Sequence, residues 1–384
     1  MFKKSLAAIA VLGTISVSAM AANFQLYGAV DTGFTYTHSG DSLTAENKFE
    51  MNSGNYAGSR FGLRGTEDLG DDLKVGFILE NGFASDTGVL GQNGGIFGRE
   101  SQLYVKGNWG TIGFGRFGAF SSGSSSMSWY WDMEPFETGY TDAGIQATQM
   151  NAWRLNSNAI YYVSPVISGI KFGVQHSFTG TDDKESQKFD DNNTFTNIAV
   201  RWDGANAKAI LGFEMERFGY IPTDENNTKK YNKQRDNAYN VKLAGAWTPN
   251  GGPATIFVGM SWFKNYDKFS DSTWDDDEKI QFDPNSGKRL QGYSAFLGGR
   301  YTIGQADLLA MVQYMDGENK AAQANAEKDY KRYVGSIGCH YHFSKRTMLY
   351  AVASYADGDG IFETIQDAKT TNRFMTHLGL THFF

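Results

Sequence analysis

The sequence is poor in cysteine, proline and histidine, and it has no excess of positive charge. Cys339 is the only cysteine among 384 residues, so an intrachain disulfide and a cysteine-based zinc site are excluded. The six prolines are few, as long paired strands require. The formal net charge of −7 argues against nucleic acid as a partner.

Long apolar runs are also missing, apart from one at the start of the chain. Lys3 and Lys4 precede an apolar run from Leu6 to Val17, and Ala19-Met20-Ala21 follows it. A basic region, a short apolar region and small residues predict a secretory signal peptide at 1–21, because the run is too short for a membrane anchor. Cleavage leaves one predicted domain at 22–384, and the loss of two lysines moves its formal charge to −9.

Strict alternation of apolar and polar residues dominates the remainder. In "SGIKFGVQHSF" (168–178), Ile170, Phe172 and Val174 fall on one face of a strand, and Lys171 and Gln175 fall on the other. The same pattern recurs in "AKAILGFEME", "AYNVKLAGAW", "GYSAFLGGRY" and "YVGSIGCHYHF". We therefore predict an all-β protein.

The connections between these strands are alternately short and long. Short turns with Gly, Asn, Asp or Pro lie near residues 70, 107, 164, 203, 249, 303 and 344. Long polar stretches lie at 38–56, 84–95, 117–156, 180–193, 218–236, 265–288, 317–329 and 358–370. Seven turns and eight loops separate sixteen antiparallel strands, and this arrangement with an even strand number is typical of outer-membrane barrels.

The polar faces of the strands carry charges of both signs. They include Lys74, Glu80, Arg201, Lys208, Glu214, Lys242 and Arg300. A closed barrel with lipid outside and water inside accounts for both faces, because unpaired backbone groups are too costly in hydrocarbon for an open sheet. So many strands leave an aqueous lumen. We expect no cofactor and no reaction.

Several segments match a known family. "LYGAVDTGF", "GSRFGLRGTEDLGDDLKVGFILENGF", "FGRESQLYVKGNWGTIGFGRFG", "NSNAIYYVSP" and "SKRTMLYAVASY" resemble the general diffusion porins of Gram-negative bacteria, above all those of beta-proteobacteria and neisseriae. The resemblance implies a sixteen-stranded transmembrane β-barrel, a homotrimer, and a third loop that folds inward and narrows the pore. It implies passive diffusion of small hydrophilic solutes and ions through the bacterial outer membrane.

The resemblance also suggests which residues form the constriction. Arg60 and Arg64 alternate with Phe61 and Leu63, so they face the lumen, and Arg99 and Arg154 occupy positions where these porins often carry lumen arginines. The third loop holds "DMEPFETGYTD", similar to the acidic segment of the family. Its candidates for the opposite wall are Glu134, Glu137 and Asp142, with Asp132 a weaker one.

The chain ends on an aromatic residue, as many outer-membrane barrels do. We expect Phe384 in "HLGLTHFF" to be a signal for the barrel assembly machinery. Acidic residues of the sixth loop, in "DDDE" and "DPNSGKRL", are candidates for bridging lipopolysaccharide through divalent cations, although a solvated loop is the simpler interpretation. His340 and His342 share a strand face but have no evident third ligand, so no metal site is expected.

Three alternatives remain open from the sequence. A solute-selective porin differs from a general one in showing saturable flux. An outer-membrane hydrolase would turn over ester or peptide substrates, and a soluble β lectin would stay in solution without detergent. The arginines favour anions and the acidic loops favour cations, so the sequence leaves the ion preference open.

Overall fold

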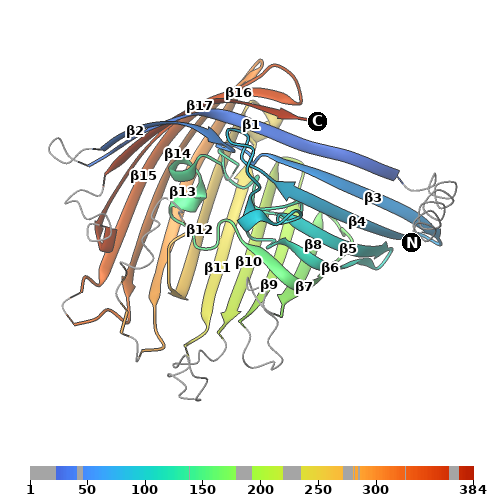
Figure 1. The fold of residues 1–384 in the computed structure, drawn as a ribbon, viewed down its shortest axis with the longest axis horizontal. Coiled ribbons are helices and arrows are strands. Elements are labelled where there is room, and N and C mark those ends of the chain that lie inside the picture. Colours follow the sequence, from blue (N-terminus) through green and yellow to red (C-terminus); the bar gives the residue numbers. More distant parts are fainter. Residues whose placement is uncertain are drawn as a thin grey trace, which may run out of the picture.

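The computed structural model describes most of the chain as antiparallel sheet (Figure 1). The described residues are 23–40, 46–137, 139–178, 193–218, 235–270, 280, 282–283, 286–324, 326–362 and 372–384. The predicted signal peptide and the "DDDE" segment lie outside them. Within these ranges, no helix has the length and apolar character needed to cross a membrane.

Seventeen strands form one sheet in which every pair of neighbours is antiparallel, and short 3-10 helices lie in its connections. The strands are β1 (Asn23–Ser39), β2 (Glu46–Ser53), β3 (Arg60–Gly70), β4 (Leu73–Gly82), β5 (Glu100–Gly107), β6 (Gly110–Gly118), β7 (Leu155–Val163), β8 (Ile170–Ser177), β9 (Thr194–Asp203), β10 (Ala207–Arg217), β11 (Ala238–Trp247), β12 (Ala254–Tyr266), β13 (Leu290–Ile303), β14 (Ala306–Asn319), β15 (Asp329–His342), β16 (Thr347–Gly360) and β17 (Arg373–Phe383). The 3-10 helices are η3 (Gln92–Gly94), η4 (Thr141–Ala143), η5 (Ile145–Ala147) and η7 (Pro249–Gly251).

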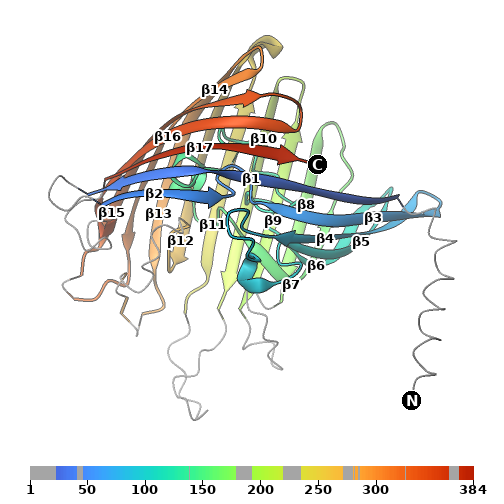
Figure 2. The ribbon, with the colours of Figure 1, turned by 45° about the horizontal axis from the view of Figure 1, so that its top comes forward.

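The first and last strands close the sheet into a barrel. One edge of β1 pairs with β17, and its other edge pairs with β2 along 32–39 and with β3 along 23–29. Figure 2 shows β2 and β3 lying one after the other along β1. They therefore share one position in the wall, and the seventeen strands fill the predicted sixteen positions of the barrel. The terminal Phe384 exchanges backbone hydrogen bonds of 3.1 and 3.2 Å with Gly28 of β1.

The first long loop is shorter than predicted. We expected loop from 38 to 56, but β1 extends to Ser39 and β2 fills 46–53. The polar residues of "ENKFEMNS" suggested a loop, yet its two apolar residues, Phe49 and Met51, are exposed on one face in ladder register with β1. His38, which the prediction placed in this loop, lies in β1.

The two faces of the wall differ as the alternation predicts. Ile170 and Phe172 are each 48% exposed on the outside of β8, whereas Gln175 is buried on the inside. The ammonium of Lys171 also points inward, 4.5 Å from the ring centroid of Trp129. The apolar outer face suits lipid, and the polar face lines the interior.

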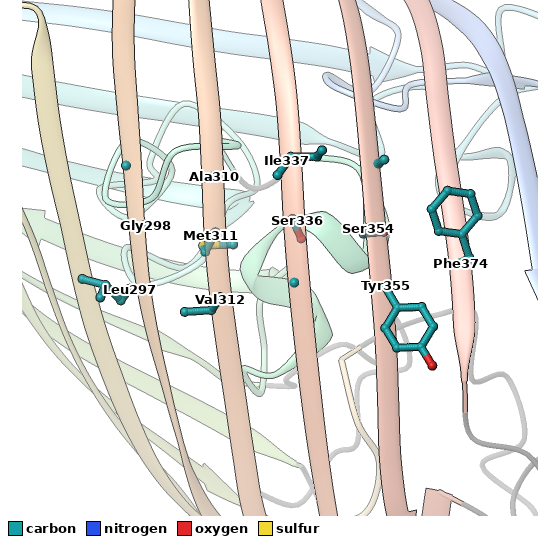
Figure 3. A pocket seen from close by; sticks show the side chains of 13 residues that line it. Leu297, Gly298, Ala310, Met311, Val312, Ser336, Ile337, Ser354, Tyr355 and Phe374 are labelled. Carbon is teal, nitrogen blue, oxygen red and sulfur yellow. The ribbon is translucent and has the colours of Figure 1, made fainter.

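Small residues leave a shallow groove on the outside of β13–β17. Gly299, Ala310, Gly335 and Ala353 form its floor, and it encloses about 540 Å³. Figure 3 shows Leu297, Val312, Ile337, Tyr355 and Phe374 around it. This groove belongs to the lipid-facing surface and not to the lumen.

Candidate functional site

The third loop, residues 119–154 between β6 and β7, lies inside the barrel (Figure 1). Phe120, Tyr130, Phe136 and Tyr140 of this loop are completely buried. They belong to one apolar cluster with inward-facing side chains from the opposite wall, such as Met311 of β14. The inward fold that the resemblance implied is therefore confirmed.

Glycines on the inner wall make room for this loop. A Cβ atom at Gly173 of β8 would lie 2.7 Å from the ring of Phe120, and one at Gly298 of β13 would lie 2.8 Å from the ring of Pro135. Real Cβ contacts are longer than this, so the loop approaches these strands only because glycine stands there.

A buried ion pair fastens both ends of the loop to the wall. Glu214 of β10 and Lys242 of β11 are completely buried and lie 3.2 Å apart. Ser121, near the start of the loop, donates to Glu214 at 2.5 Å, and its carbonyl accepts from Lys242 at 2.9 Å. Asn151, near the end, donates to Glu214 at 3.0 Å. The two charges of this pair therefore compensate each other and stabilise the attachment of the loop.

Asp132 forms a second attachment in the middle of the loop. It accepts hydrogen bonds from Arg201 at 2.8 Å and from Lys208 at 2.6 Å. Burial acts to raise the pKa of Asp132, but these hydrogen bonds outweigh it, so the pKa lies below its ordinary value. Asp132 therefore stays ionised at neutral pH and holds the loop against β9 and β10.

The three other acidic candidates have different surroundings. Glu137 accepts hydrogen bonds from Arg300 at 2.7 Å and from the hydroxyl of Tyr56. Asp142 is completely buried and forms ion pairs with Arg332 of β15 and Arg373 of β17.

Glu134 is also completely buried, and it accepts from the backbone N–H of Phe136 at 2.7 Å. Of the acidic residues expected to oppose the arginines, only Glu137 lines the cavity described next.

A cavity of about 440 Å³ lies between the third loop and the wall at β3. We call it the arginine cavity. Its charged lining residues are Arg60, Arg64, Arg99, Glu80 and Glu137. The structure therefore brings three of the four predicted arginines together with one predicted acid.

The arginines of the cavity differ in how their positive charge is compensated. Glu80 of β4 lies 2.7 Å from Arg99 and 3.6 Å from Arg60, so one carboxylate serves two cations. Arg64 donates to the amide oxygen of Gln25 at 2.9 and 2.7 Å and stacks over Tyr27 at 5.0 Å. Its partners in the described part of the chain are neutral.

The fourth arginine lies elsewhere. Arg154 forms a bidentate ion pair with Glu216 at 3.1 and 3.2 Å and lies 4.4 Å over the ring of Phe195. It also donates to Asn156 at 3.0 Å, and it is outside the lining of the arginine cavity.

Sequence reasoning missed the cations that hold the loop and the indoles that line the cavity. Arg201, Lys208 and Arg300 stood out as inward charges, but the alternation does not reveal their partners. Trp131 and Trp153 line the cavity from the third loop, and no motif of the sequence marks either of them as a pore residue.

The paired histidines are both engaged with other side chains. His340 lies 2.8 Å from the hydroxyl of Tyr140, and His342 lies 3.1 Å from Asp307. Across the described ranges, no group of three His, Cys, Asp or Glu side chains has the spacing of a metal site.

A closed barrel with an apolar exterior, a charged interior and an inward loop defines a class of membrane channel. Comparisons with known proteins agree. The model of the Gram-negative porin family matches residues 6–361. An outer membrane porin protein of Bordetella pertussis is 29% identical over the whole of both chains, and outer membrane porin protein 32 of Delftia acidovorans is 28% identical over 91% of this chain and 88% of its own.

Solved structures show the same fold. The anion-selective porin from Comamonas acidovorans superposes with a TM-score of 0.69 at 21% identity, over 94% of this chain and all of that one. The outer membrane channel DcaP of Acinetobacter baumannii gives 0.64 at 15% identity, over 95% and 98%.

The chain belongs to the Gram-negative porin family. It is an outer-membrane porin, a water-filled channel through which small hydrophilic solutes and ions diffuse passively.

Proposed function

We propose that the arginine cavity is the constriction of this channel and that it favours anions over cations. The main support is the unequal pairing of its charges. Glu137 is paired with Arg300, Glu80 is shared by Arg60 and Arg99, and Arg64 has neutral described partners. The cavity therefore carries an excess of positive charge at its lining.

A positively charged lining of this kind concentrates anions in the channel. Fixed charges beside a narrow aqueous path raise the local concentration of the opposite ion, and low-dielectric walls focus their field. Salt screens charges beyond about 10 Å at 0.1 M, so charges that line the narrow path act on a passing ion more strongly than distant ones. The net charge of the chain therefore matters less than the arginines.

The related fold described as an anion-selective porin is consistent with this preference. Glu134, Asp142 and Arg154 remain predicted constriction residues. Their buried contacts favour a second role, in which they hold the loop and the wall together.

The reversal potential under a KCl gradient tests the proposal. We expect a sign that indicates preferential chloride flux in the wild-type channel. The double variant Arg60→Glu and Arg64→Glu should move the reversal potential toward that of a cation channel. A reversal potential that is the same in both proteins would show that these residues do not form the constriction.

We also propose a homotrimer, and an unpaired strand edge supports it. Among the described strands, β2 pairs with β1 alone, which leaves its other edge without a ladder partner. Free edges are costly beside lipid and are covered in stable barrels. Phe49 of β2 is 70% exposed, and Val89 and Ile96 of the second loop are also exposed. A neighbouring subunit would cover this face.

The remaining proposals concern assembly and surroundings. We propose that residues 1–21 are removed as a signal peptide, that Phe384 is read by the barrel assembly machinery, and that the outer loops contact lipopolysaccharide. We further propose that the channel catalyses no reaction. A solute-selective porin remains the alternative within the family, and saturable flux of one solute would identify it.

A further inference from the structure

The arginine cavity has an aromatic side that a plain ion path does not require. Trp131 and Trp153 of the third loop line it and are 43% and 38% exposed. Other large aromatics of the same loop, such as Trp129 and Tyr130, are almost or completely buried. The two exposed indoles are therefore not needed for the packing of the loop in the way that their neighbours are.

The opposite side of the cavity offers donors for an anion. A guanidinium has five N–H donors, and the described hydrogen bonds of Arg64 use two of its nitrogens, Nε and Nη2. Gln25 and Tyr27 hold its plane in place through hydrogen bonding and stacking. Arg60 donates through Nη1 to the carbonyl of Gly58 at 2.9 Å, which fixes it nearby. Planar, positioned guanidinium groups suit carboxylates.

We propose that the arginine cavity weakly binds small aromatic carboxylates as they pass. The carboxylate lies against Arg64 and Arg60, and the ring lies against Trp131 and Trp153. This inference rests on the proposed anion preference and adds a substrate class to it. A volume of about 440 Å³ accommodates a single-ring carboxylate, and aromatic rings attract one another beyond the burial of area alone.

Benzoate is a suitable probe, with acetate and cyclohexanecarboxylate as matched anions. Single channels are recorded in KCl while one anion is added to one side. We expect benzoate to reduce the chloride current in a saturable manner and at lower concentrations than either comparison anion. Acetate lacks the ring, and cyclohexanecarboxylate has the ring size without the π-system.

Variants separate the indoles from the arginines. The double variant Trp131→Leu and Trp153→Leu should weaken the effect of benzoate by about three- to tenfold, the size of an aromatic pair contribution. Arg64→Gln should weaken benzoate and acetate together. Trp262→Leu is the control, because this indole is also exposed but lies on the outer face of β12, so its loss should leave the effect unchanged.

The outcomes distinguish this inference from the proposed function. Each variant's KCl current shows that it is a folded channel. If the wild-type channel prefers chloride but benzoate acts no more strongly than cyclohexanecarboxylate, or the double tryptophan variant responds like the wild type, the aromatic site is wrong and the anion preference stands. If the reversal potential shows no chloride preference, the proposed function fails as well.

Discussion

Asp142 of the third loop lies 2.6 Å from Arg332 of β15, and the two are separated by 190 residues of chain. Arg373 of β17 pairs with the same carboxylate. All three side chains are buried. This cluster therefore fixes the segment around Asp142 to β15 and β17, far from the strands β6 and β7 that the loop connects. The narrowing of the lumen therefore depends on residues from distant parts of the sequence.

Asp142→Asn should loosen the attachment of the third loop to β15 and β17. The change removes the carboxylate charge that two buried guanidinium groups share, and breaking a buried ion pair costs about 3–5 kcal/mol. We expect lower resistance to thermal unfolding and a noisier single-channel current. Asp359→Asn, at an exposed position of β16, is the control and should behave like the wild type. A quiet, fully stable Asp142→Asn channel would show that the cluster does not hold the loop.

Gly298→Val should disturb the path of the loop along the wall. The new side chain would overlap Pro135, and overpacking of this kind costs about 1–3 kcal/mol. We expect Pro135 to move toward the lumen and the conductance to fall. Gly335→Val is the matched control, because a Cβ there has open space around it on the outer face of β15. Equal conductance in the two variants would contradict the close approach.

The alternation of residues predicts most of the wall, and the glycine contacts show where such prediction stops. A barrel strand can be predicted from its own residues, since every second one meets lipid. The position of a loop cannot be predicted in this way, because it depends on contacts with distant strands. Glu134 and Glu137 are three residues apart, yet one is buried within the loop and the other lines the cavity. The partners that decide this, such as Arg300, come from distant strands.

The four predicted arginines show the same difference between strand residues, which alternation places, and residues at the loop, which it does not place. Arg60 and Arg64 follow from alternation on one strand, and the structure places both on the cavity. Arg154 lies where the chain leaves the loop, and its orientation depends on Glu216 of β10 and Phe195 of β9. The strand β2 was missed because most residues of "ENKFEMNS" are polar, and the two apolar residues Phe49 and Met51 did not indicate a strand.

Acidification should weaken the attachment at Asp132. Because its pKa is lowered in the folded protein, its contribution to stability is present above the ordinary carboxylate pKa of about 4 and is lost as the pH falls through the folded value. We expect steady currents from neutral pH down to about 4 and increasing noise below it. Asp132→Asn should be noisy already at neutral pH. Identical pH profiles for both proteins would exclude Asp132 as the cause.

Charges on the free edge of β2 should disrupt the proposed trimer. Phe49→Lys with Met51→Lys places two cations on the face that a neighbour would cover, and we expect monomers in detergent by light scattering. Val258→Lys is the control, since it adds an outer-face charge on β12, away from this edge. Intact trimers of the double variant would place the subunit contact elsewhere.

The most direct measurement of the whole account is the accessibility of a cysteine placed in the arginine cavity. The native Cys339 is first replaced by serine, and Trp153→Cys is then introduced. A charged, water-soluble thiol reagent should reduce the single-channel current of this protein in one step per channel, and it should leave a Trp262→Cys channel unaffected. If modification at position 153 left the current unchanged, the ions would be passing somewhere other than the space between the third loop and the arginines.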